Sequence, residues 1–163
     1  MTELNGGLIR SDAALKVLLA HDGSDASLLG VRTLIDFCAR LREAPNVHLL
    51  FVHPPVPIAF AAEHVSREVL DTYYREEGEQ ALSAAAILLD EAGLAFTPHI
   101  HVGSVAETVV RVAGELGCEL ICLGTHGRGA LSTALLGSVA SKVVHLSHVP
   151  VLLAKQHAPP PKP

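Results

Sequence analysis

The chain has 163 residues, of which 49% are apolar and 18% are charged, a composition typical of one globular domain rather than of a disordered chain. Its net charge of −5 and its scattered Lys and Arg residues exclude nucleic acid as a main partner, since phosphate backbones are bound by basic patches. No apolar run approaches the length of a membrane span, and the first residues lack the pattern of a signal peptide, so we expect a cytoplasmic protein.

The first half of the chain predicts a strand, a helix and a second strand. Residues 15–20 are a continuous apolar run, typical of a buried strand, and an amphipathic helix begins at Asp25 with Ser24 or Asp25 as its cap. The inner face of this helix is predicted to carry Leu28, Leu29, Val31, Leu34, Ile35 and Cys38. A second strand follows at 47–52, and the proline-rich residues 53–60 are expected to form a loop.

A long helix is then predicted over residues 63–91, followed by a strand at 95–102. Gly78 interrupts the helix at a cost of about 1 kcal/mol relative to Ala, so we expect a bend there, and Gly93 ends the helix. Pro98 cannot donate to a ladder, so the strand that contains it belongs at a sheet edge. The apolar face of the helix is predicted to hold Val65, Val69, Tyr73, Leu82, Ala85 and Leu89.

The last third of the chain continues the alternation. A helix is predicted over 104–116, in which Ser104 and Glu107 form a capping box. The remaining elements are a strand at 119–123, a helix at 137–146 and a strand at 149–154. Strands that alternate with helices predict a single-domain α/β fold, with an open parallel five-stranded sheet in the order 3-2-1-4-5 and helices on both faces, as in Rossmann-like proteins.

Glycines follow the fourth predicted strand in a pattern that favours phosphate binding. Gly124, Gly127 and Gly129 come before Gly137 and Ser138, where a helix begins, and together they read G-x2-G-x9-G-S. Glycines permit positive φ and close approach of the backbone, and the free N–H groups at a helix start attract anions. The pattern is neither a P-loop nor a dinucleotide fingerprint. Because strands one and four are adjacent in the predicted order, this loop meets the residues that follow the first strand.

This motif resembles the nucleotide-binding signature of the universal stress protein family, in its ATP-binding branch, and the resemblance covers residues from about 15 to 155. It implies a universal stress protein domain at 14–155 with an adenine nucleotide alpha-hydrolase-like fold, between an N-terminal extension, 1–13, and a proline-rich tail, 156–163. It also implies a cytoplasmic stress-response protein that binds ATP. The residues implied in the pocket are Ala20 and Val52 near the adenine, Leu123 along the wall, and Gly127, Gly137, Ser138 and Val139 at the phosphates.

Two further groups near the predicted site admit two interpretations each. Asp22 directly follows the first strand, where its carboxylate could bind a ribose hydroxyl or Mg²⁺, or could simply form the turn in the DGSD sequence. Arg128, with His126, lies inside the glycine loop, where a cation would help to hold phosphates, although a solvated loop tip explains both residues equally well.

The histidines and cysteines give weaker signals. His99 and His101 share one face of the edge strand, and His145 and His148 lie near a helix end, but neither pair has a further ligand at compact spacing. We therefore interpret them as surface or packing residues. The three cysteines are an odd number, and we expect buried thiols rather than disulfides.

The functional hypothesis is an ATP-binding regulatory protein with an unknown protein partner. No nucleophile–base pair is evident, so no catalytic residue is assigned. Two alternatives remain open: a slow ATPase or nucleotide-using enzyme of the same architecture, and a dimeric scaffold that binds no nucleotide. We also expect a homodimer through the strand at 149–154, because it is apolar on both faces and lies at a sheet edge. Alternatively, the C-terminal tail covers that edge.

Overall fold

The computed structural model describes residues 14–56, 66–125 and 136–155. The elements are β1 (Lys16–Ala20), α1 (Asp25–Cys38), β2 (Asn46–His53), α3 (Arg67–Glu91), β3 (Phe96–Val102), α4 (Val105–Leu116), β4 (Leu120–Gly124), α5 (Ser138–Leu146) and β5 (Val151–Ala154). Each predicted element within these residues is present, with its ends shifted by up to two residues in most cases. The start predicted for the long helix lies partly outside the described residues.

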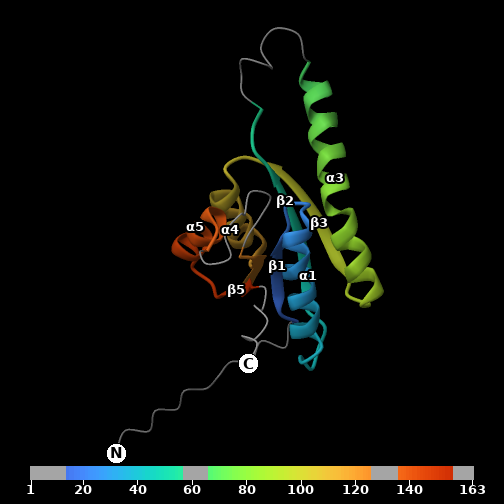
Figure 1. Ribbon diagram of the computed structural model, residues 1–163, viewed down its shortest axis with the longest axis vertical. Coiled ribbons are helices and arrows are strands. Elements are labelled where there is room, and N and C mark those ends of the chain that lie inside the picture. The colour runs from blue at the N-terminus through green and yellow to red at the C-terminus, as the bar shows by residue number, and fades with distance from the viewer. Residues whose placement is uncertain (1–13, 57–65, 126–135, 156–163) are drawn as a thin grey trace, which may run out of the picture.

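The five strands form one parallel sheet in the order β3-β2-β1-β4-β5, as the sequence predicts. Helices α1 and α3 cover one face, and α4 and α5 cover the other (Figure 1). The central strand β1 is buried on both faces, because Leu18 packs against the α4–α5 side and Leu19 against the α1–α3 side. Complete burial of a leucine side chain contributes about 1.5–3 kcal/mol, which explains why residues 17–20 of this strand are all apolar.

The N-terminus of α1 is capped by Ser24, whose Oγ accepts a hydrogen bond from the Ser27 nitrogen at 3.2 Å. The inner face differs from the prediction, because Leu28 and Leu29 are only partly buried while Ser27 and Gly30 are buried. A Cβ on Gly30 would lie 3.1 Å from the Gly124 nitrogen, which is closer than nearly all such contacts in proteins. Small residues on this side of α1 therefore let the helix lie directly against the end of β4.

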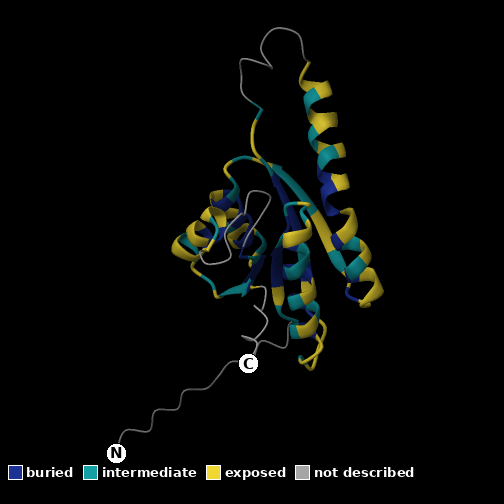
Figure 2. Cartoon of the chain, in the orientation of Figure 1, coloured by how far each residue is buried: buried dark blue, intermediate teal, exposed yellow. Residues whose placement is uncertain are grey.

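The residues of helix α3 that are buried against the sheet lie from Gly78 onward. Leu82, Ala85 and Leu89 are buried, as predicted, but Val69 and Tyr73 are 59% and 42% exposed, so the prediction for the first half was wrong. Figure 2 shows this N-terminal half as mostly exposed. The helix continues through Gly78, where a Cβ would lie 2.6 Å from side-chain atoms of Ile100. Glycine is thus required there by close helix–sheet packing.

Helix α4 begins after Ser104, but the predicted capping box has a different form. The Ser104 hydroxyl donates to the Glu107 carboxylate and makes no side-chain bond to the helix backbone. Glu107 also pairs with Lys142 of α5. The carboxylate that was expected to cap α4 therefore connects two helices.

The three cysteines are buried free thiols, as predicted. Burial raises the pKa of Cys122 to about 12. Within the residues that the structure describes, none of the helices has the combination of length and apolarity that crossing a membrane requires.

Candidate functional site

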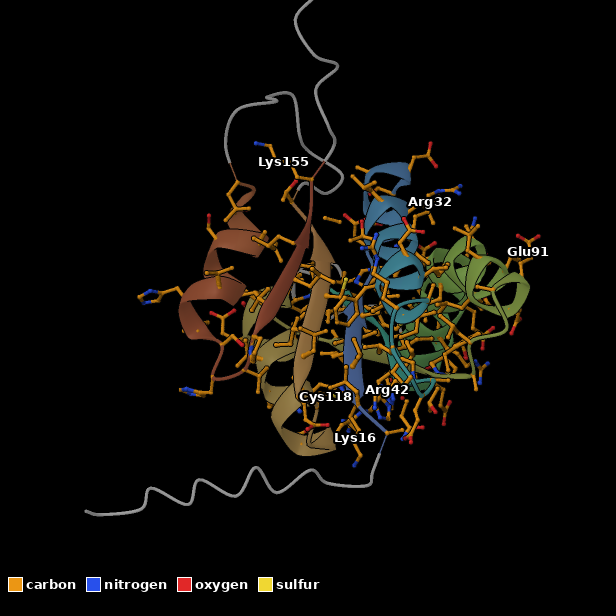
Figure 3. The ribbon with its side chains drawn as sticks, turned by 90° about the horizontal axis from the view of Figure 1, so that it is seen from below. Lys16, Arg32, Arg42, Glu91, Cys118 and Lys155 are labelled. Carbon is orange, nitrogen blue, oxygen red and sulfur yellow. The ribbon has the colours of Figure 1, made fainter. Side chains whose placement is uncertain are left out.

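The carboxyl ends of the strands meet at one edge of the sheet, where α/β proteins of this topology bind ligands. Ala20 ends β1 between its two neighbours and pairs with Leu50 of β2 and Leu123 of β4. Figure 3 shows Lys155, which follows β5, at this edge and Lys16, which begins β1, at the opposite edge. The predicted site residues of the first, second and fourth strands therefore come together at the carboxyl edge.

One backbone hydrogen bond fixes the N-terminus of α5 at the end of β4, and a second one holds the end of β4 against β5. The Thr125 nitrogen donates to the Ala154 oxygen at 3.0 Å, and the Gly137 nitrogen donates to the Thr125 oxygen at 2.8 Å. The chain thus leaves β4 and returns to the same point to begin a helix. The first N–H groups of α5, at Ser138 and Val139, consequently start beside the end of the strand.

These N–H groups have no side-chain cap, in contrast to the first turns of α1 and α3. The residue before α5 is Gly137, which has no side chain to accept from them, whereas Ser24 and Ser66 cap α1 and α3; Ser104 makes no such bond to α4. Ser138 and Val139 are also exposed. The first four N–H groups of a helix have no partner within it, and the helix dipole places partial positive charge there. The arrangement is suited to an anion.

Of the two roles predicted for Gly137, positive φ is not adopted, while close approach of the backbone to a ligand stays a prediction. Its φ is −60°, so its backbone conformation is open to any residue, and the glycines with positive φ among the described residues are Gly23, Gly93, Gly103 and Gly117. Gly124 likewise ends β4 in extended form. What Gly137 contributes is the absence of a side chain beside the first turn of α5.

A salt bridge holds the middle of α5. Lys142 pairs with Glu107 of α4, and this hydrogen bond, aided by the one from Ser104, lowers the pKa of Glu107 to about 2. The carboxylate therefore stays ionised throughout the physiological range. The helix that carries the candidate anion site is held at its start by Thr125 and one turn later by Glu107.

Asp22 forms the turn between β1 and α1. Its Oδ1 accepts from the Ser24 nitrogen at 3.0 Å and from the Ser24 hydroxyl at 2.6 Å, and Gly23 adopts a φ of 81°. The turn-forming interpretation of DGSD therefore describes this structure. It is compatible with a ligand role as well, because the side chain is only half-buried at the carboxyl edge.

His21, between β1 and this turn, was missed in the sequence. Its ring is 4% exposed, and its Nδ1 lies 2.7 Å from the Ser27 hydroxyl. That hydroxyl donates to the Ser24 oxygen at 2.8 Å, so it accepts from His21, which places a proton on Nδ1. The interaction joins the end of β1 to the first turn of α1. A single histidine after an apolar strand gives no signal of such a role.

The end of β2 holds an apolar residue, Val52, followed by a histidine in an aromatic contact, His53. Val52 is buried, as is Leu123 of β4, while Ala20 between them is half-buried, and Val52 and Leu123 belong to the hydrophobic core on the α4–α5 side. Beyond Val52, the ring of His53 lies 4.9 Å from that of Tyr74, whose hydroxyl accepts from the Val56 nitrogen at 3.0 Å. The sequence analysis did not find this aromatic contact, since α3 and β2 are joined by a segment of irregular pattern.

Four predicted residues, His126, Gly127, Arg128 and Gly129, lie outside the described residues. The part of the site that is described offers backbone donors at α5, apolar residues at the ends of three strands, and a carboxylate at the β1–α1 turn. These groups match the phosphate, base and sugar of a nucleotide in kind.

Comparisons with known proteins agree with this architecture. The model of the universal stress protein family matches residues 14–155. Universal stress protein MJ0531 of Methanocaldococcus jannaschii is 30% identical over 86% of this chain and 82% of its own length. The solved structure of MJ0577 has a TM-score of 0.75 at 28% identity and covers 89% of this chain and 98% of that one.

A structure of the universal stress protein from Archaeoglobus fulgidus in complex with dAMP has a TM-score of 0.61 at 22% identity, covering 87% of this chain and 98% of that one. At this identity the likeness concerns the fold. The match of the family model over most of the sequence, together with the sheet order and the relative MJ0531, shows that the chain belongs to the universal stress protein family.

Proposed function

We propose that this protein is a cytoplasmic stress-response regulator that binds an adenine nucleotide, ATP in particular, at the carboxyl edge of the sheet. The observation that carries the proposal is the uncapped N-terminus of α5, which a backbone hydrogen bond between Gly137 and Thr125 holds at the end of β4. Family membership supports it, and so does the relative from Archaeoglobus fulgidus that was solved with dAMP.

The proposal gives each part of the nucleotide its own residues. The phosphates lie over Gly127, Gly137, Ser138 and Val139, with Gly124 and Gly129 shaping the loop and Arg128 supplying a cation. The adenine lies near Ala20 and Val52, and Leu123 lines the pocket. Asp22 accepts from the ribose or holds Mg²⁺. Occupancy then changes the loop or a surface that a protein partner reads.

Calorimetry on Gly137→Val tests the site directly. The wild-type φ of −60° is open to valine, so we expect a folded variant, while its branched side chain covers the first N–H groups of α5 and abolishes ATP binding. Gly114→Val is the matched control, because a Cβ there meets nothing within 4 Å, and it should bind as wild type does. Unchanged affinity in folded Gly137→Val would refute the phosphate assignment.

The same titrations with AMP and GTP define the ligand. Weaker binding of GTP supports base recognition, and a gain in affinity from AMP to ATP places the additional phosphates in contact with the protein. A turnover of about 1 s⁻¹ or faster in the presence of Mg²⁺ lies in the ordinary enzyme range and would favour the enzymatic alternative.

A further inference from the structure

Two histidines from adjacent strands meet on the α4–α5 side of the sheet. His48 of β2 and His99 of β3 place Nδ1 and Nε2 3.0 Å apart, with their ring centroids at 5.2 Å. They are diagonal neighbours, since Leu50 is the residue that pairs with His99. The sequence pairs His99 with His101 and gives no sign of His48, because strand adjacency is not visible in the spacing of residues along one strand.

The separation of the two nitrogens matches that of metal ligands. Imidazole nitrogens bind divalent zinc at about 2.0–2.1 Å, so two ligands at a right angle lie about 2.9 Å apart, and two at a tetrahedral angle about 3.4 Å apart. The observed 3.0 Å is close to the first value. Right-angled nitrogen coordination is typical of Cu²⁺ and Ni²⁺.

We propose that His48 and His99 form a two-histidine site for a divalent transition metal of the Ni²⁺ or Cu²⁺ type, with water in the remaining positions. Both rings are half-buried and reach solvent, because β3 is the edge strand and this side of it is only partly covered. Among the residues that the structure describes, no third His, Cys, Asp or Glu joins them in a ligand cluster.

Metal binding at the pair requires a free lone pair on both facing nitrogens. One of the two facing nitrogens carries a proton in the present contact. Metal binding moves it to the other nitrogen of the same ring, so no net proton is released.

The surroundings of the pair carry little other charge. The α4 side chains buried in this layer include Val109 and Val112, which are uncharged. Lys16 of β1 lies on the same face of the sheet, and its Nζ donates to the Leu116 oxygen at the end of α4, at 3.4 Å. The charge of Lys16 opposes a bound cation, so the affinity of the proposed site depends on the two imidazoles.

Titration of the untagged full-length chain with NiCl₂ at pH 7.5 tests the proposal. We expect His48→Gln and His99→Gln each to weaken the tightest Ni²⁺ site by about tenfold or more. His101→Gln is the matched control on the same strand and face, and His145→Gln is the control for an exposed helical histidine; both should change the affinity by less than about twofold. If His101→Gln and His99→Gln weaken Ni²⁺ binding equally, two histidines of β3 bind the metal and the proposal is wrong.

A spectrum of the wild type decides the question even if a variant unfolds. In long-range ¹H–¹⁵N spectra of the imidazoles, substoichiometric Ni²⁺ should broaden the signals of His48 and His99 before those of other histidines. Uniform broadening, or selective loss of other signals, would refute the pair as the site.

Discussion

Gly30 controls how closely α1 approaches the candidate site. Its missing side chain leaves room for the backbone of β4 at the point where that strand ends. Because the opposing atoms belong to a central strand, they cannot rotate away as the end of a long side chain can. The contact therefore links the stability of the domain to the position of Gly124.

We predict that Gly30→Val lowers the free energy of unfolding by about 1–3 kcal/mol, the usual cost of overpacking. A Cβ at this position lies 3.1 Å from the Gly124 nitrogen and 3.3 Å from the Leu123 carbonyl carbon. Urea denaturation measures the effect. Gly114→Val, in the open part of α4, should stay within about 0.5 kcal/mol of wild type. If both variants lower the free energy of unfolding equally, helix propensity and not the contact with β4 is responsible.

At the scale of elements, α4 and α5 are joined through one exposed carboxylate. Glu107 accepts from Ser104 on its own helix and from Lys142 on the next. The pKa of a carboxyl group falls when hydrogen bonds favour its charged form. This interaction is present above the ordinary pKa of 4.5 and is lost as the pH falls through about 2.

We predict that Lys142→Ala raises the pKa of Glu107 from about 2 toward its ordinary value of 4.5, because its main partner is removed. Carbon-13 NMR of the carboxyl group follows the titration. Lys142→Arg keeps the charge and should retain most of the shift, and Ser104→Ala should raise the pKa by less than Lys142→Ala does. A Glu107 that titrates near 4.5 in the wild type would contradict the salt bridge.

The sheet order was predictable because strands buried on both faces, such as β1 and β4, are continuous apolar runs separated by helical patterns. The buried face of α3 was not predictable over its whole length. The periodicity that includes Val69 and Tyr73 cannot show whether a sheet lies beneath that half of the helix. The strand–loop–helix order at the site was also visible. Two features of the site were not visible in the sequence: the negative φ of Gly137 and the contact of His21 with Ser27. Both depend on how separate segments of the chain meet.

At the scale of the whole molecule, β5 is an edge strand of the sheet that the described residues form. The oxygens of Pro150 and Ala154 accept from Ile121 and Thr125, so the residues between them alternate toward and away from β4. Val151 and Leu153 consequently point their backbone groups outward. A row of unpaired groups at an edge is a template for pairing with another chain, and a two-fold pairing of identical strands closes at two copies.

We predict a homodimer of twice 17.2 kDa that depends on this edge. Leu153→Pro removes an outward N–H and keeps the ladder to β4, so light scattering should report a monomer. Leu153→Ala shortens the same side chain but retains the N–H and should remain dimeric. Circular dichroism confirms that both variants are folded. A wild-type chain that is monomeric at micromolar concentration, or a dimeric Leu153→Pro, would exclude pairing through β5.

The hydrogen bond between Gly137 and Thr125 also has a consequence for protein engineering. It joins the Gly137 nitrogen to the Thr125 oxygen at 2.8 Å, so these two residues are held together whatever the length of the chain between them. For a flexible loop, each doubling in length adds only about 0.6 kcal/mol of closure entropy. A guest peptide inserted between Thr125 and Gly137 would therefore leave the sheet intact, and this position is a natural acceptor for a grafted recognition sequence.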